Sequence, residues 1–392
     1  MAVPLVLWGT YDIGKPRVRN LIAALEQLYP DVRSSHFNLW SGVEDKSGIP
    51  LKRILAITAR LLCCYPWLLY RYCRLPAHQV VVLPYPCILD ALVLWPFAKC
   101  RGAKLCCDLF LSLYDTAVVD RRLIKKASLA ARLLYRIEWL TMRLADFVLT
   151  DTQSHKDYLC RLYYIDSEKV HVVWVGADDS FSKHSPKSPE VTSDRTNVLF
   201  YGQFIPLHGL DHLVQAISRI EALGRKDITF HIIGRGQEAE HIDAMITEMG
   251  IRSILRTPWV DYSQLPTLIA AADICLGIFP DEGKGARVIP NKLFQIMAVG
   301  RPVVTAKTSG ICEILQPGPG VRLTAMGDSE DTANKILDLV DCLSDATQRT
   351  REVEGAMALP SIGPNQISLQ LKRVLSAYLP TDLSDGKRRR DG

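Results

Sequence analysis

The sequence predicts an α/β protein made of two doubly wound domains, each with a parallel sheet. The second half of the chain alternates strand-like and helix-like segments from residue 198 to residue 343. This alternation is typical of a parallel sheet with helices on both faces. The first half alternates less regularly, and a polar stretch at 177–197, rich in Ser and Pro, separates the halves. A chain of 392 residues, 48% of them hydrophobic, can form two cores of ordinary size.

In the first half, short apolar runs predict strands, and a helix is expected from Val18 to Leu28. The opening apolar run is too short for a signal sequence, and no positively charged segment or cleavage site accompanies it, so we interpret it as the first strand. The expected strands are residues 4–9, 79–84, 103–109, 147–150 and 170–175.

In the second half, each expected strand is followed by an expected helix. The strands are predicted at 198–201, 228–233, 254–260, 274–279, 302–306 and 321–324, and the helices at 210–222, 237–249, 264–272, 290–299, 310–315 and 332–343. One more amphipathic helix is predicted at 366–378. The predicted organisation is a first domain (1–180), a linker (181–196), a second domain (197–360), a C-terminal helix (361–380) and a basic disordered tail (381–392).

The composition argues against several classes of protein. The net charge of +5 is small, and part of it lies in the run 387–390, so nucleic-acid binding is not indicated. The 11 cysteines are scattered and show no CxxC spacing, so neither a zinc site nor a redox motif is expected, and reduced cysteines indicate the cytoplasm. No stretch reaches the roughly 20 uninterrupted apolar residues of a membrane-spanning helix.

Two basic amphipathic segments, 52–75 and 121–143, interleave Arg and Lys with Leu, Ile and aromatic residues. Such segments bind the interface of a bilayer, which would make the protein a peripheral protein on the cytoplasmic face of a membrane. They are equally typical of amphipathic helices that pack on a sheet and turn a basic face to solvent. The sequence leaves both interpretations open.

Loops that follow the strands are the expected place of the functional site, because ligands of open parallel sheets bind at the carboxyl ends of the strands. Four such loops, 9–17, 202–209, 234–238 and 280–292, are rich in glycine and in polar or basic residues. At the facing edges of two sheets, these loops predict a cleft between the domains.

The loop 234–238 opens the pattern G-x-G-x-x-A, which dinucleotide-binding proteins share. It lies in the middle of the chain, however, and no acidic residue follows at the spacing that contacts a ribose, so nicotinamide and flavin cofactors are not expected. We expect Gly234 and Gly236 to let the backbone approach a phosphate or a sugar. Arg235 either contacts that anion or is solvated.

Three cations, Lys284, Arg287 and Lys292, lie close together before and within the expected helix 290–299. The first turn of that helix, with Asn291 and Lys292, would bind an anion through free N–H groups and the helix dipole. The alternative is a solvated first turn on a core helix. No D-x-D motif is present to hold a divalent cation, so we expect no metal site, and the charge of a diphosphate would be met by these side chains.

Taken together, four segments of the second half resemble the retaining glycosyltransferases of family 4: VLFYGQFIPLHGLDHLVQAI, ITFHIIGRGQE, LPTLIAAADICLGIF and KLFQIMAVGRPVVTAKTSGICEIL. The first half resembles them more loosely, through GTYDIGKP, RLADFVLTDTQSHKDYL and KVHVVWVGAD. That family has the GT-B architecture, in which two Rossmann-like domains face each other across a cleft. The resemblance implies that the first domain binds an acceptor and that the second binds a nucleotide-diphosphate sugar, with no further cofactor.

Several family residues are replaced in this chain. The Arg and Lys with which the family binds the diphosphate align with Gln203, which follows Gly202, and with His208, which precedes Gly209. These replacements remove two fixed positive charges, so the resemblance implies that the diphosphate is bound by other cations nearby.

The two family glutamates, separated by seven residues, align with Arg287 and Gln295, so both carboxylates of the E-x7-E motif are absent. The resemblance implies that Gln295 binds the ribose through its amide oxygen. Arg287 cannot accept hydrogen bonds. Either the sugar is bound differently from the family, or Glu282, on the same loop, makes the sugar contact of the earlier glutamate; Glu313 lies near the same edge.

In the first domain, the resemblance implies a glycine loop at 9–17, in which Gly14 provides room and Lys15 adds a cation. Asp108 follows an expected buried strand, where the family commonly has a histidine near the sugar. Asp108 is therefore the expected sugar-contacting or catalytic carboxylate. A capping or ion-paired aspartate is the alternative.

The function implied by the resemblance is a retaining, metal-independent transfer of a sugar to the hydroxyl of an acceptor, which is lipid-linked or a glycoconjugate. Lys292, Arg287 and His208 are expected to stabilise the departing diphosphate. Because family residues are replaced, two alternatives stay open: an epimerase or phosphorylase of the same fold, and a non-catalytic binding subunit.

Overall fold

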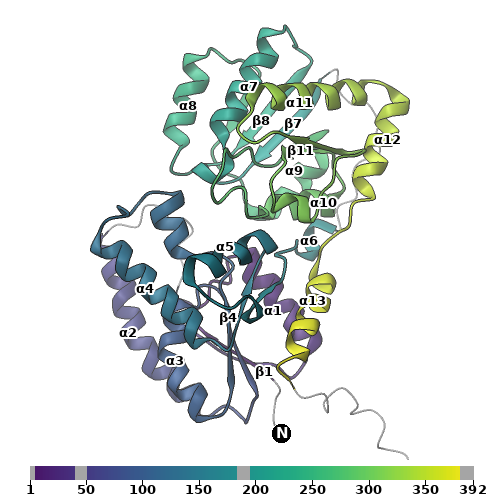
Figure 1. Cartoon of the computed structure of the whole chain (residues 1–392). Helices are drawn as coiled ribbons and strands as arrows, with labels where there is room; N and C mark the ends of the chain where they lie inside the picture. The colour runs from purple at the N-terminus through teal and green to yellow at the C-terminus, as the bar shows by residue number, and fades with distance from the viewer. Residues whose placement is uncertain (1–4, 40–50, 183–194, 380–392) are drawn as a thin grey trace, which may run out of the picture.

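The computed structural model describes residues 5–39, 51–182 and 195–379, with only the backbone described at 51–59 and at 62. It contains two six-stranded parallel sheets, one in each of the two domains that Figure 1 shows. Loops at the strand ends of both domains line a shared cavity. The predicted fold class, two facing doubly wound domains, is confirmed. The predicted tail at 381–392 and most of the predicted linker lie outside the described residues.

The first sheet has the strand order β2-β1-β3-β4-β5-β6 and is parallel throughout. Its inner strands are runs of buried apolar residues, as expected for a sheet covered on both faces. The sequence pattern does not predict β2, because this edge strand has the polar sequence RSSH. The strands are β1 (Leu5–Gly9), β2 (Arg33–His36), β3 (Val80–Leu83), β4 (Lys104–Asp108), β5 (Phe147–Thr150) and β6 (Val170–Val172).

Helices from both ends of the chain cover the first sheet. One face packs against α2 (Leu51–Cys73), α3 (Ile88–Cys100), α4 (Leu129–Leu144) and α5 (Gln153–Tyr163). The other face packs against α1 (Pro16–Leu28) and α13 (Pro364–Ser376). Figure 1 shows α13, in yellow, beside α1, in purple, and the Ser368 hydroxyl donates to the Ala24 carbonyl between them. The last helix of the described residues, α13, therefore completes the core of the first domain.

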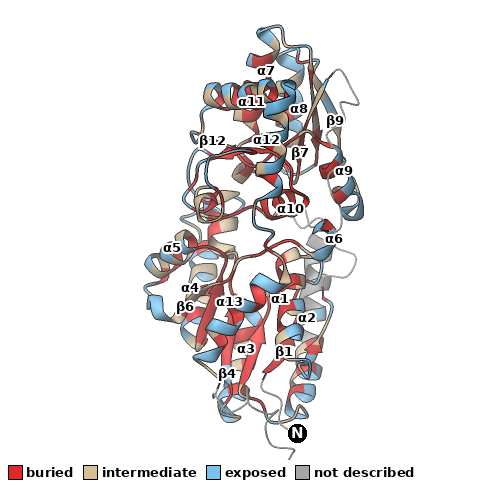
Figure 2. Cartoon of the chain, turned by 90° about the vertical axis from the view of Figure 1, so that its right-hand side faces the viewer, coloured by how far each residue is buried: buried red, intermediate tan, exposed pale blue. Residues whose placement is uncertain are grey.

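The second sheet has the strand order β12-β11-β10-β7-β8-β9. Its inner strands are largely buried between helices whose outer faces are exposed, as Figure 2 shows for α7 and α11, whereas the edge strand β9 is only partly buried. Its strands are β7 (Thr196–Tyr201), β8 (Ile228–Ile233), β9 (Ile254–Thr257), β10 (Ile274–Leu276), β11 (Val303–Ala306) and β12 (Val321–Thr324). The helices that follow α6 (Asp179–Ser182) are α7 (Leu210–Ala222), α8 (Ala239–Glu248), α9 (Leu265–Ala271), α10 (Asn291–Val299), α11 (Ser329–Ser344) and α12 (Ala346–Met357).

The second domain follows its predicted alternation of strands and helices closely, with two differences. The expected helix at 310–315 is a single 3-10 turn, Ile311–Glu313. The polar helix α12 is not predicted, because its sequence, ATQRTREVEGAM, has few apolar residues to form a periodic stripe.

Candidate active site

A cavity of about 390 Å³ lies between the domains and is lined by both of them. The first domain contributes the loops that follow β1, β4 and β5, and the second contributes the loops that follow β7, β8 and β9 together with the start of α10. A concave site of this size is typical of small-molecule binding. Nine residues predicted from the sequence line it: Gly14, Lys15, Gly202, Gln203, His208, Gly234, Asn291, Lys292 and Gln295.

Lys292 and His208 approach each other over Gly202, at the end of β7. Gly202 has a φ of +150°, and a Cβ atom there would lie 3.1 Å from both His208 Cε1 and Lys292 Nζ. Lys292 Nζ donates to the Gly277 carbonyl at 3.3 Å and lies 3.6 Å from the centroid of the Phe200 ring. Glycine at 202 therefore leaves the space in which the two nitrogen-bearing side chains meet.

Burial controls the charge of this pair. It lowers the pKa of Lys292 well below the ordinary lysine value. It also lowers the pKa of His208 well below the ordinary histidine value, and the neighbouring Lys292 charge lowers it further. His208 Nδ1 has no hydrogen-bond partner in the described part of the chain. A bound anion would raise both pKa values, because a nearby negative charge favours the protonated forms.

The first turn of α10 faces the same cavity. Pro290 is the N-cap residue, with φ −66° and ψ 140°, and both Pro290 and Asn291 line the cavity beside Lys292. The helix N-terminus carries the positive end of the helix dipole and unpaired N–H groups. Side-chain donors and the dipole of α10 therefore converge on one wall of the cleft.

Gln295 belongs to a hydrogen-bond network that runs out of the cavity. Its Oε1 accepts from the Tyr201 hydroxyl at 2.9 Å, and its Nε2 donates to the Tyr262 hydroxyl at 3.2 Å. Tyr262 in turn donates to Asp178 Oδ2 at 2.7 Å, and Arg19 of the first domain lies over the Tyr262 ring. The amide oxygen expected to bind a ribose is thus already engaged by Tyr201, which leaves one lone pair for a ligand.

Arg287 does not line the cavity, contrary to the prediction. Its Nη2 pairs with Asp115 of the first domain at 3.0 Å, and its guanidinium lies 3.7 Å from the centroid of the Tyr158 ring. Asp115 is fully buried and also accepts from the Tyr158 hydroxyl at 2.9 Å. The Arg287 carbonyl accepts from the Thr152 hydroxyl at 2.6 Å. The guanidinium and the backbone carbonyl of Arg287 therefore both bind the first domain.

Lys284 and Glu313 also contact the first domain. Lys284 Nζ donates to the Thr116 hydroxyl at 2.5 Å. Glu313 Oε1 accepts from the backbone N–H of Gln153 at 2.8 Å, at the N-terminus of α5. Glu282 is exposed and does not line the cavity. The structure corrects the expectation that these three residues bind the donor, because two of them hold the domains together and the third faces solvent.

Asp108 is not a cavity residue either. It is fully buried and forms an ion pair with Arg17, whose Nη2 lies 2.7 Å from Asp108 Oδ1. The expectation of a sugar-contacting carboxylate at 108 is wrong, and the ion-paired alternative is correct. The carboxylate that lines the cavity is Asp151, in the loop after β5. The signal that could have identified it is an aspartate at a strand end, followed by His155 four residues later.

The glycines of the loop after β8 make room for a neighbouring loop. A Cβ atom at Gly234 would lie 1.9 Å from the Gly202 carbonyl oxygen, and one at Gly236 would lie 2.6 Å from the Phe204 carbonyl oxygen. We expected these glycines to let a phosphate or a sugar approach the backbone. Instead they let the loop after β8 pack closely against the loop after β7, although Gly234 also lines the cavity. Gly209 is the N-cap of α7 and lies outside the cavity lining.

Two aromatic residues that were not among the predicted site residues, Trp259 and Tyr262, form part of the cavity wall after β9. The side chain of Trp259 is 48% exposed, and the Arg235 guanidinium lies 4.5 Å from the centroid of its ring. Arg235 does not itself line the cavity. An accessible indole ring is a surface on which another planar ring can stack.

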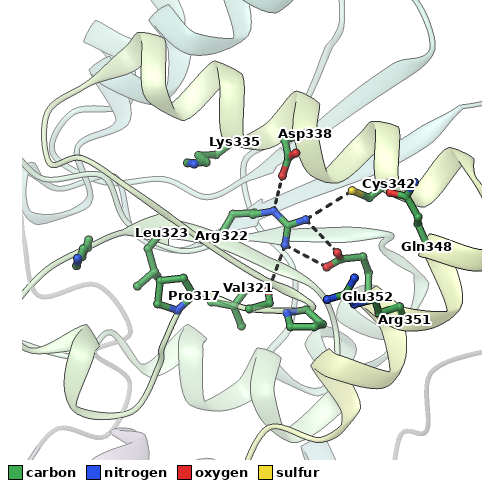
Figure 3. A pocket seen from close by; sticks show the side chains of 13 residues that line it. Pro317, Val321, Arg322, Leu323, Lys335, Asp338, Cys342, Gln348, Arg351 and Glu352 are labelled. Atoms are coloured by element: carbon green, nitrogen blue, oxygen red, sulfur yellow. Dashed lines mark hydrogen bonds and ion pairs between the residues drawn. The ribbon is translucent and has the colours of Figure 1, made fainter.

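A larger pocket, of about 630 Å³, lies on the outer side of the second domain between β12, α11 and α12 (Figure 3). Arg322 extends through it and pairs with Asp338 and with Glu352. Its positive charge is thereby compensated within the protein, and all lining residues belong to the second domain. The interdomain cavity is therefore the stronger candidate for an active site.

Neither a metal site nor a membrane span stands out in the part of the chain that the structure describes. No three His, Cys, Asp or Glu side chains gather there as metal ligands would. None of the helices described combines the length and hydropathy needed to span a bilayer.

Two facing parallel sheets with a cleft at their strand ends define the GT-B fold. HepE of Anabaena, in complex with UDP and glucose, is similar to this chain with a TM-score of 0.67 and 15% identity, over 96% of this chain and 100% of HepE. The sucrose-phosphate synthase of Thermosynechococcus elongatus is similar with a TM-score of 0.66 and 17% identity, over 95% of this chain and 98% of that protein. These similarities confirm the fold.

The sequence comparison finds a family match within the second domain. Residues 195–342 match the family described as Glycosyl transferases group 1. D-inositol 3-phosphate glycosyltransferase 2 of Catenulispora acidiphila is 27% identical over 211 residues, which cover 50% of this chain and 48% of that protein. Lipopolysaccharide core biosynthesis glycosyltransferase LpsE of Rhizobium meliloti is 24% identical over 166 residues, 42% of this chain and 44% of that protein. The chain thus spans about half the length of the curated relatives it matches, and the family match lies within its second domain.

Proposed function

We propose that the protein transfers a sugar from a nucleotide-diphosphate sugar to an acceptor hydroxyl, with retention of configuration at the anomeric carbon. The observation that carries this proposal is the convergence of Lys292, His208 and the N-terminus of α10 around Gly202, inside a cleft that both domains line. Donors fixed in such a place stabilise the negative charge that develops on a departing diphosphate.

In the proposed reaction, the bond from the anomeric carbon to the diphosphate oxygen breaks and a bond to the acceptor oxygen forms on the same face of the sugar. The acceptor proton passes to the departing phosphate. Lys292 and His208 donate hydrogen bonds to that phosphate, and Lys15, on the first-domain wall of the cavity, adds a further cation. No metal is assigned to this step, because the sequence has no D-x-D motif to hold one.

A uridine nucleotide is the first candidate for the donor. HepE, which shares the fold, is described in complex with UDP, with UDP-glucose and with UDP and glucose. In this chain the wall after β9 offers the Trp259 ring, against which a planar base can stack. The proposed donor is therefore a UDP-sugar, bound with its base near Trp259 and its diphosphate near Lys292.

The proposed acceptor is a lipid-linked or glycoconjugate hydroxyl presented at a membrane surface. The outer face of α4 supports this proposal, because Leu129 and Leu133 are 80% and 61% exposed. Arg132 and Arg136 are exposed on the same helix. An exposed apolar face flanked by cations is suited to an anionic bilayer surface. LpsE, one of the relatives, is named for lipopolysaccharide core biosynthesis.

The test is release of nucleotide from a panel of UDP-, GDP- and dTDP-sugars, with and without membrane extract as a source of acceptor. We expect release from one donor that depends on the extract, and Lys292→Ala should lower the rate by about 30- to 1,000-fold, since one such contact contributes roughly 2–4 kcal/mol to transition-state stabilisation. Release from no donor would favour a non-catalytic binding subunit. Turnover without an acceptor, or only with free phosphate, would favour an epimerase or a phosphorylase.

A further inference from the structure

Asp151 is the only carboxylate among the described residues that line the interdomain cavity. It lies between β5 and α5 and is 2% exposed. The next residue, Thr152, donates to the Arg287 carbonyl at 2.6 Å. Asp151 is thereby held beside the segment 288–291, which leads into α10 and lines the same cavity. The first domain thus places one acidic group in the cavity that the start of α10 also lines.

His155 fixes one oxygen of this carboxylate. His155 Nδ1 lies 2.7 Å from Asp151 Oδ1, and the imidazole is fully buried. Because a carboxylate accepts hydrogen bonds, Nδ1 carries the proton and donates it. The Thr150 hydroxyl adds a longer bond, of 3.4 Å, to the same oxygen.

The other oxygen of Asp151 is open. Within residues 5–39, 51–182 and 195–379, the hydrogen bonds of the Asp151 carboxylate go to Oδ1, and Oδ2 has no partner. Oδ2 does not belong to the fully buried polar atoms that lack a partner, so part of its surface is accessible. The His155 contact therefore orients the carboxylate so that Oδ1 is hydrogen-bonded within the protein and Oδ2 is available at the cavity.

The cavity offers different chemistry to the two ends of a nucleotide-diphosphate sugar. A diphosphate needs hydrogen-bond donors, and Lys292 and His208 provide them. Sugar hydroxyls also donate hydrogen bonds, and they bind most strongly to an ionised acceptor. Asp151 is the lining residue that supplies such an acceptor.

We propose that Asp151 Oδ2 accepts a hydrogen bond from a hydroxyl group of the transferred sugar, and that His155 is the positioning residue for this contact. The inference rests on the proposed glycosyl transfer and deepens it, because it assigns recognition of the sugar to the first domain. It also explains how the cleft can hold a sugar although Glu282, Glu313 and Asp108 all lie outside the cavity lining.

The test compares Asp151→Asn and Asp151→Ser with the wild-type protein and with Asp157→Asn, a control at an exposed aspartate of α5. Two quantities are measured for the donor that the wild type turns over: kcat/KM for transfer, and affinity for the free nucleoside diphosphate. Each Asp151 variant should lower kcat/KM by about 10- to 150-fold, the usual range for a hydrogen bond to a charged group. Affinity for the free nucleotide should stay within about twofold of wild type, because the nucleotide lacks the sugar that Asp151 contacts.

A series of donors that each lack one sugar hydroxyl identifies the contact. For the wild type, one deoxy donor should show the same loss of kcat/KM as Asp151→Asn does with the full donor, and that variant should lose nothing further with the same deoxy donor. Circular dichroism verifies that each variant is folded, and the two substitutions guard against one of them failing to fold. A folded Asp151 variant with wild-type kcat/KM overturns the inference, whereas a wild type that turns over no donor overturns the proposed function instead.

Discussion

Replacing Arg287 tests whether its ion pair with Asp115 holds the two domains together. In Arg287→Met, the buried Asp115 carboxylate keeps the Tyr158 hydroxyl but loses the guanidinium, which contacts both carboxylate oxygens at 3.0 and 3.1 Å. Breaking a buried ion pair from one side costs about 3–5 kcal/mol when the remaining charge cannot reach water. Separation of the domains would hydrate Asp115, so the closed arrangement should lose less, about 1.5–3 kcal/mol, the range for a hydrogen bond to a charged group.

That loss should appear in the function of the cleft more than in the stability of either domain. A destabilisation of about 1.5–3 kcal/mol corresponds to a factor of roughly 10 to 150 in the equilibrium between closed and open arrangements. We expect kcat/KM for the donor to fall by a similar factor, and the radius of gyration from small-angle X-ray scattering to rise. Arg225→Met is a matched control, because Arg225 pairs with Asp227 and Asp341 within the second domain.

A double-mutant cycle isolates the pair. Arg287→Met, Asp115→Asn and the double variant should be strongly non-additive, because each single change removes the same contact. A coupling free energy below about 0.5 kcal/mol would refute the reasoning, since it would mean that the contact is exchanged for water without consequence.

Three further predictions concern the cavity and the surface. Burial lowers the pKa of Lys292, so the unfolded chain binds more protons than the folded one and the free energy of unfolding should rise with pH toward the ordinary lysine value. A bound diphosphate reverses the shift, so UDP-glucose binding should take up protons and weaken as the pH rises. Calorimetry in buffers of different ionisation enthalpy measures this uptake, and equal uptake in Lys292→Met would contradict the assignment to Lys292. Trp259→Ala should weaken UDP binding by about 2- to 13-fold if the base stacks on the ring, and an unchanged Kd would exclude that position for the base. The double variant Leu129→Ser, Leu133→Ser should lower sedimentation with phosphatidylglycerol vesicles relative to phosphatidylcholine vesicles, whereas Leu223→Ser, exposed on the second domain, should not, and equal binding by all variants would remove α4 from the membrane contact.

The position of the chemistry has a simple basis in the fold. In both sheets the strands are parallel, so all loops after strands emerge at one edge, and the two edges face the same cavity. The residues that line the cavity are therefore drawn from several loops, each of which follows a strand. This arrangement keeps Gly202 and His208 in a fixed relation to Lys292, although β8, β9 and β10 separate these parts of the chain.

The sequence by itself determined the two sheets and the loops that carry the site. Alternation of apolar runs and amphipathic segments is a local property, because strand and helix periods depend on residues a few positions apart. The prediction failed where the local pattern was weak, at the polar edge strand β2 and the polar helix α12. It succeeded in placing Gly202, His208 and Lys292 at the cavity, because the end of a parallel strand and the start of a helix can be read from sequence.

Only the tertiary structure decided how each charged side chain is used. The sequence shows Arg287, Lys284 and Asp108 as equally available, but their partners lie 172, 168 and 91 residues away along the chain. In the folded protein, a buried charge lies next to an opposite charge or a hydrogen-bond partner that compensates its lost hydration. That partner cannot be identified from residues that are near in the sequence. The same long-range packing brings Asp151 to the cavity wall.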